Sequence, residues 1–254
     1  MATQAGTHTQ PLNVVLAPLE AATASENLQF YGGKTLPRLE WTHVYLGRGA
    51  AADRKHLDAA VPAAMTDRRL NAVIEQYFPK ETVESVFRGS QAGPVSLPRM
   101  DKPSVERVVT SLKLPGVATL LLPPGAILAD GEVTSENGLG GYHGSVGGHY
   151  YAVAVYSEGT NGIVAFDEPW KNVCATVYHE LQEARTDPDV EDAIRTGKNS
   201  YLAWYSPQGG EIGDIPIATS PLHDVMREVP LADGSGTVPV QLMWSNKDEA
   251  PAAS

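Results

Sequence analysis

Apolar and polar positions follow two different periods along the chain, and these periods predict strands and helices in mixed order. Alternation or short apolar runs predict strands at 12–17, 41–46, 82–87 and 117–122. The run at 117–122 is apolar except for Thr119, so we expect a buried strand. Spacing of three and four residues predicts helices at 50–78, 104–114 and 172–186.

Two of the predicted helices carry signals for where they break or stop. The segment 50–78 contains Pro62, which removes a backbone donor, so we expect the helix to break near it. The helix 172–186 should stop near Asp187 and Pro188, because proline disfavours helical geometry in the residue before it.

The remaining pattern completes a single mixed domain. We expect a strand pair, 150–156 with 163–166, around a turn at Gly159–Gly162, and a last strand at 238–244. The mixed order favours an α/β (α+β) fold in which a mixed sheet packs against helices. No linker divides the chain, so we expect one domain at 12–244 between flexible tails at 1–11 and 245–254.

Composition and charge exclude several classes of function. The chain has 254 residues, 42% of them hydrophobic, and a formal net charge of −11. An acidic chain of this kind is not expected to bind nucleic acid, which needs a basic face. No apolar run is long enough for a membrane span. The polar first ten residues do not resemble a secretion signal, so we expect a cytoplasmic protein, with secretion by another route left open.

Candidate chemistry is concentrated in the predicted helix 172–186. His179 and Glu183 are four residues apart, which places them on one helical face and lets them grip one metal ion. Glu180 lies between them, where the related H-E-x-x-H pattern has the carboxylate that polarises water. Two alternatives stay open at this point. The three side chains could form a solvated helix face, or Arg185 could neutralise Glu180 or Glu183.

A glycine-rich turn further along offers the missing ligand. Glu211 and Asp214 stand among glycines in Gly209-Gly210-Glu211-Ile212-Gly213-Asp214. A metal site needs a third protein ligand beside His179 and Glu183, and either carboxylate could supply it. The alternative is a hairpin turn whose acidic side chains face water.

These motifs resemble a known family. The helix sequence H-E-L-x-E-A-R-T-D-P at 179–188, the pair Trp204-Tyr205 and G-E-I-G-D at 210–214 are similar to motifs of a family of bacterial zincin-like proteins. The segment Gly138–Gly144 with Tyr150–Val153 resembles another part of that family. A more distant similarity links it to the plant phosphate-induced, exordium-like proteins. The resemblance implies a zincin-like domain with an active-site helix.

The resemblance also implies roles for individual residues. His179 and Glu183 would bind the metal, Glu180 would be the general base, and Glu211 or Asp214 would ligate or support the site. Zincin architecture places a strand beside the active helix, so His143 could be a further ligand or stabilise an oxyanion. For His149 we expect a loop position without a role. The metal is expected to be Zn²⁺, with Mn²⁺ or Ca²⁺ also acceptable to a carboxylate-rich site.

Two functions from different classes follow from these residues. The first is a metal-dependent hydrolase, foremost a metallopeptidase acting on a peptide or protein. The second is a non-catalytic metal-binding or assembly protein on the same scaffold, which predicts a closed ligand shell.

Overall fold

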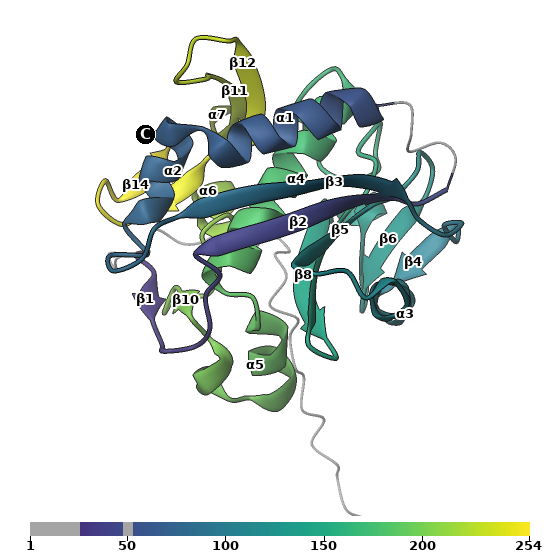
Figure 1. Cartoon of the computed structure of the whole chain (residues 1–254), viewed down its shortest axis with the longest axis horizontal. Helices are drawn as coiled ribbons and strands as arrows, with labels where there is room; N and C mark the ends of the chain where they lie inside the picture. The colour runs from purple at the N-terminus through teal and green to yellow at the C-terminus, as the bar shows by residue number, and fades with distance from the viewer. Residues whose placement is uncertain (1–25, 48–52) are drawn as a thin grey trace, which may run out of the picture.

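The computed structural model describes residues 26–47 and 53–254. Within them, a five-stranded sheet lies at the centre, in the order β3-β2-β5-β9-β8 (Figure 1). Its strands are β2 (Arg38–Tyr45), β3 (Glu84–Ala92), β5 (Val117–Leu121), β8 (Gly141–Val146) and β9 (His149–Ala154). The first three and β9 are parallel, and β8 runs antiparallel to β9 at the edge.

Helices cover both faces of this sheet because its strands are apolar on both sides. Val117 and Leu121 of β5 pack into a core shared with α1 (Arg54–Thr66), α2 (Arg68–Glu75) and α4 (Pro169–Thr186). Ala118 and Leu120 point the other way, toward α3 (Lys102–Leu112). Figure 1 shows α1 along one side of the sheet and α3 end-on at the other. The structure is therefore mixed α/β with helices packed on sheets, as the sequence predicts.

Smaller elements surround the central layers. Short sheets are formed by β1 (Gln29–Phe30) with β10 (Trp204–Tyr205), β4 (Arg99–Asp101) with β6 (Ile127–Asp130) and β7 (Val133–Thr134), β11 (Met226–Pro230) with β12 (Thr237–Gln241), and β13 (Met243–Ser245) with β14 (Ala250–Ala252). Short helices are α5 (Val190–Thr196), α6 (Asp214–Thr219), α7 (Leu222–Val225), and the 3₁₀ turns η2 (Ser135–Asn137) and η3 (Asn199–Tyr201).

The predicted break at Pro62 is wrong. Pro62 lies inside α1, and the chain instead changes direction at Asp67, whose carboxylate accepts hydrogen bonds from the first backbone N–H groups of α2. Val61 and Met65 are fully buried on either side of the proline. Their packing stabilises α1 although Pro62 removes one of its backbone hydrogen bonds. The cap at Asp67 then starts the next helix, α2.

The predicted pairing of 150–156 with 163–166 is also wrong. β9 pairs instead with β8, and a single bridge between Glu158 and Asn161 closes the turn. The backbone N–H groups of Ala165 and Phe166 donate to the side chain of Asn172 at the start of α4. These donors are therefore used locally, which leaves them unavailable to a strand ladder.

The C-terminal residues 245–254 are not a loose tail, since β14 pairs with β13 there. The side chain of Asn246 fixes the turn by bonding the backbone N–H and C=O of Leu28, 218 positions earlier. The predicted strand at 238–244 is divided between β12 and β13. The predicted strand at 12–17 and tail at 1–11 lie outside the described residues.

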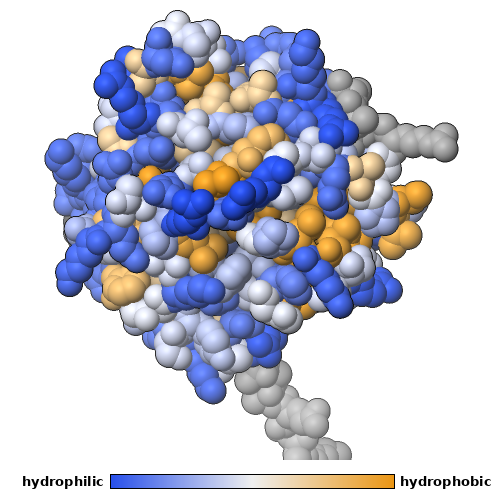
Figure 2. Space-filling view, in the orientation of Figure 1, coloured by the Kyte–Doolittle hydropathy of each residue, from blue (hydrophilic) through white to orange (hydrophobic). Residues whose placement is uncertain are grey.

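The surface is mainly polar on the face that Figure 2 shows. It is mostly hydrophilic, with apolar patches between the hydrophilic residues. Across residues 26–47 and 53–254, none of the helices combines the length and the apolar character that crossing a bilayer requires.

Candidate metal centre

The candidate site is built on α4, which lies against β8, β9 and β12. His179, Glu180 and Glu183 are only 8%, 4% and 3% exposed. The alternative of a solvated helix face is therefore wrong for these side chains. Buried carboxylates need a partner of opposite charge, so the question becomes what balances them.

Arg185 does not balance them. Its guanidinium donates hydrogen bonds to the backbone oxygens of Pro37 and Glu84 and to the hydroxyl of Ser85. Because Arg185 lies two residues beyond Glu183, its side chain leaves α4 on a different face, where it connects the helix to the start of β2 and β3. The second alternative from the sequence, neutralisation by Arg185, is thus wrong.

One potential metal-binding set consists of His179, Glu183 and Asp214. Nε2 of His179 lies 3.0 Å from Oε2 of Glu183 and 3.9 Å from Oδ1 of Asp214. Nδ1 of the same ring lies 2.8 Å from Oε1 of Gln241, whose amide nitrogen donates to the carbonyl of Gly213. Because that amide oxygen can only accept, Nδ1 carries the proton. When the ring is neutral, as it must be to bind a metal ion, its lone pair on Nε2 therefore points at the carboxylates.

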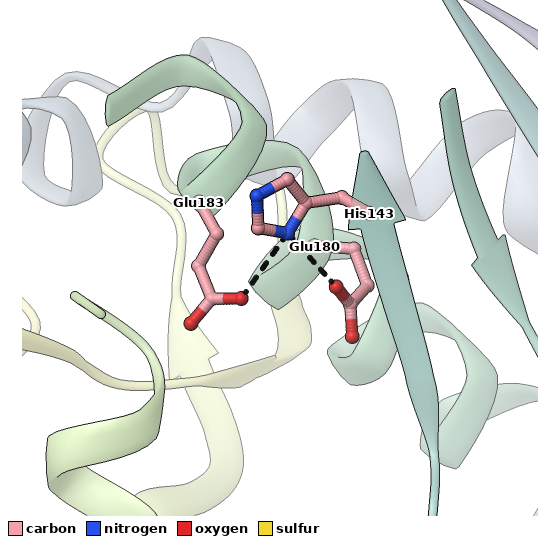
Figure 3. Close-up of side chains that lie close together, drawn as sticks. All are labelled: His143, Glu180 and Glu183. Carbon is pink, nitrogen blue, oxygen red and sulfur yellow. Dashed lines mark ion pairs between the residues drawn. The ribbon is translucent and has the colours of Figure 1, made fainter. Parts of the chain in front are cut away.

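A second set consists of His143, Glu180 and Glu183 (Figure 3). The His143 side chain reaches from β8 toward α4, and its Nδ1 lies 3.5 Å from Oε2 of Glu180 and 3.5 Å from Oε2 of Glu183. Its Nε2 lies 3.2 Å from the backbone oxygen of Asp187, which can only accept. Gly141 leaves no room for a side chain, because a Cβ there would lie 2.4 Å from the backbone oxygen of Val153 and 2.9 Å from Oε1 of Glu180.

The glycine-rich turn delivers its carboxylates to α4, so the alternative of a turn facing water is wrong. Glu211 is 6% exposed, and the side chain of Asp214 is 19% exposed. The N–H of Gly213 donates to Oε1 of Glu183, which leaves the other oxygen facing the imidazoles. Gly213 must be glycine, because a Cβ there would lie 2.5 Å from Nδ1 of His179.

The carboxylates of the cluster raise the pKa values of both histidines. Burial works to lower the pKa of His179, but the carboxylates of Glu183 and Glu180 outweigh it and raise this pKa to about 10. Burial likewise opposes the charge on His143, whose pKa the carboxylates of Glu211, Glu180 and Glu183 raise well above its usual value. Protons on the two imidazoles therefore occupy the place that a cation could take.

The pKa values of the four carboxyl groups shift in opposite directions. Burial raises the pKa of Glu180 and of Glu211, and it raises the pKa of Asp214 to about 7. Burial acts on Glu183 too, but His179 and His143 outweigh it and lower its pKa to about 2. Glu183 is thus the carboxylate that stays ionised between the two imidazoles.

These residues fit a divalent metal ion. Imidazole nitrogens and carboxylate oxygens are ordinary ligands of such ions. Oε1 of Glu211 is buried and has no hydrogen-bond partner within the described part of the chain, as a ligand or ligand support would leave it. The two sets could therefore hold a metal ion, with Glu183 common to both.

A cavity of about 510 Å³ opens onto the cluster. His143, His179 and the four carboxylates line it together with the apolar side chains of Leu139, Ile163, Val164, Ile217 and Leu222. A site that borders such a cavity is open on one side, which a purely structural metal site is not.

Three further residues, His149, Cys174 and Gln241, differ in their relation to the site. His149 pairs with Val146 at the far end of the β8–β9 hairpin and does not line the cavity. Cys174 is buried in the core, and burial raises its pKa. Gln241 was missed, because it lies 62 positions from His179 in a separate strand and no local pattern marks it.

Comparison with known proteins adds no relative to this picture. No protein-family model matches the chain, and no curated protein matches it either.

Proposed function

We propose that the protein is a divalent-metal-dependent hydrolase, foremost a metallopeptidase. The observation that carries this proposal is the grouping of His179, Glu183 and Asp214 beside an open cavity. Asp214 serves as the third ligand because its carboxylate belongs to this set. Glu211 supports the site from behind His143, at 3.5 Å from its Nε2. Zn²⁺ is the first choice of metal, and Mn²⁺ or Ca²⁺ could replace it in a carboxylate-rich site.

A divalent cation held there supplies a Lewis acid that polarises a carbonyl and lowers the pKa of water. Glu180 takes the proton from the attacking water and returns it to the leaving nitrogen. Burial raises the pKa of Glu180, which brings the group closer to the working pH of a general base. His143 lies 3.5 Å from Glu180 and donates a hydrogen bond to the oxygen on which charge develops.

The apolar side chains around the cavity support a peptide substrate. β8 is the outermost strand of the central sheet and carries His143 at its middle, but its residues 142–144 are buried and α5 contacts the strand, so this edge is covered. The apolar side chains that line the cavity can accept the side chains next to a scissile peptide bond.

The competing function, a non-catalytic metal-binding or assembly protein, predicts a shell of ligands closed to solvent and substrate. The cavity beside the cluster favours the hydrolase over this alternative.

The first test combines metal analysis with a Glu180→Gln variant. We expect metal by elemental analysis in both proteins and cleavage of a broad peptide library by the wild type. Loss of general-base catalysis should lower kcat by about 10²–10⁴-fold in the variant, with metal retained. Glu132→Gln, an exposed Glu at a turn, is the matched control and should be as active as wild type. Equal activity of Glu180→Gln and wild type would remove Glu180 from the mechanism, and no cleavage with any divalent ion would refute the hydrolase.

A further inference from the structure

The two sets of potential ligands are built alike, although they come from different elements. In each, the outer nitrogen of an imidazole faces an oxygen that can only accept: Oε1 of Gln241 for His179 and the backbone oxygen of Asp187 for His143. In each, the inner nitrogen faces Oε2 of Glu183. This is the arrangement in which a hydrogen-bonded imidazole presents its free nitrogen to a metal.

The spacing in the His143 set fits a cation better than direct contact. A charge-assisted hydrogen bond between imidazole and carboxylate spans about 2.7–2.9 Å. Here Nδ1 of His143 is 3.5 Å from both Glu180 and Glu183. Ligand atoms that surround one tetrahedral ion with bonds of about 2.0–2.2 Å lie about 3.3–3.6 Å from each other. Both separations from Nδ1 of His143 match the second distance.

The charge of the cluster is compatible with a second cation. If Glu180, Glu183, Glu211 and Asp214 are all ionised when metal binds, they carry four negative charges, which two divalent ions would balance. Leaving buried charges unpaired is costly. Oε1 of Glu211, buried and without a hydrogen-bond partner among the residues described, adjoins the His143 side of the cluster.

We propose that His143, Glu180 and Glu183 form a second divalent-cation site, joined to the His179 site through Glu183, and that its occupation inhibits the enzyme. Inhibition follows because a ligand role takes Glu180 away from proton transfer and His143 away from the substrate oxygen. This part rests on the proposed hydrolase function, whereas the existence of the second site does not.

The test titrates Mn²⁺ into chelator-stripped full-length protein, with equilibrium dialysis and elemental analysis to count bound ions. We expect two ions per chain, and an exchange-broadened electron paramagnetic resonance spectrum in place of the six lines of isolated Mn²⁺. His143→Asn should keep the first ion and weaken the second more than about 100-fold, beyond what loss of an outer-shell partner costs. His149→Asn, on the same hairpin, is the control and should bind both ions.

The second part of the test measures peptide cleavage during the same titration. Cleavage should rise as the first ion binds and fall as the second binds. A plateau at one ion per chain, or a second ion that survives in both His143→Asn and Glu180→Gln, would overturn the second site even if the protein is a hydrolase. Activity that rises with the second ion would overturn its inhibitory role. Two bound ions without any cleavage would uphold the site and refute the hydrolase instead. Glu180→Gln provides the answer if His143→Asn fails to fold.

Discussion

Gln241→Leu tests how the first metal site is held in place. The side chain of Gln241 accepts from Nδ1 of His179 at 2.8 Å and donates to the carbonyl of Gly213 at 2.7 Å. It is 2% exposed, and leucine has a similar volume, so the packing should survive while both hydrogen bonds are lost.

Two consequences can be given a magnitude. Two buried polar groups lose their partners, each at a cost of about 1–3 kcal/mol, so the free energy of unfolding of the metal-free protein should fall by about 2–6 kcal/mol. Without Gln241 the ring of His179 is free to turn, and metal affinity should fall about 10–100-fold, as it does when an outer-shell partner is removed.

Denaturant unfolding of the metal-free protein measures the first quantity, and calorimetric titration with Zn²⁺ measures the second. Gln208→Leu, at an exposed position near the same turn, is the control and should change neither. A folded Gln241→Leu protein that binds Zn²⁺ within twofold of wild type would refute the idea that Gln241 orients His179.

Three further predictions concern the same cluster and its support. Gly213→Ala should weaken metal binding at least as much as Gln241→Leu, because the new Cβ would lie 2.5 Å from Nδ1 of His179; calorimetry with unchanged affinity would contradict it. The pKa values of His179 and Asp214 are raised to about 10 and about 7 in the folded protein. Both groups therefore bind their protons more tightly in the folded than in the unfolded chain, so they make the metal-free protein lose stability as pH rises from 4 through 10. Metal must displace these protons, so the rise in melting temperature on adding Zn²⁺ should grow from pH 6 to pH 8, and a shift independent of pH would oppose this explanation. Asp67→Ala removes the acceptor for the backbone N–H groups of Arg69 and Leu70 and for that of Ala232, so it should cost at least about 1–2 kcal/mol of unfolding free energy, read from urea denaturation with metal absent; a loss below about 0.5 kcal/mol would argue against the cap.

The local sequence pattern was sufficient to predict the following features, each of which depends on one helix or strand or on their order. The helix through His179 and Glu183 follows from its apolar spacing and from Pro188, and helical geometry alone places the two side chains one turn apart. The buried strand β5 follows from a run that is apolar except for Thr119. The mixed fold class follows from the order of these elements.

Pairing and packing were decided only in the folded molecule. β9 pairs with β8, while the backbone N–H groups of Ala165 and Phe166, in the segment that the sequence predicts as its partner, donate to the side chain of Asn172. Pro62 stays within α1 because the core compensates for its missing hydrogen bond.

For the site, the sequence by itself determined which residues on α4 and in the glycine-rich turn can bind a metal, since ligand type and helical spacing are local properties. Only the tertiary structure decided that His143 from β8 meets Glu180, that Arg185 turns away, and that Gln241 holds His179. These contacts join segments far apart in the chain, and they depend on the packing of α4 between the sheet edge and β12, which no local pattern encodes.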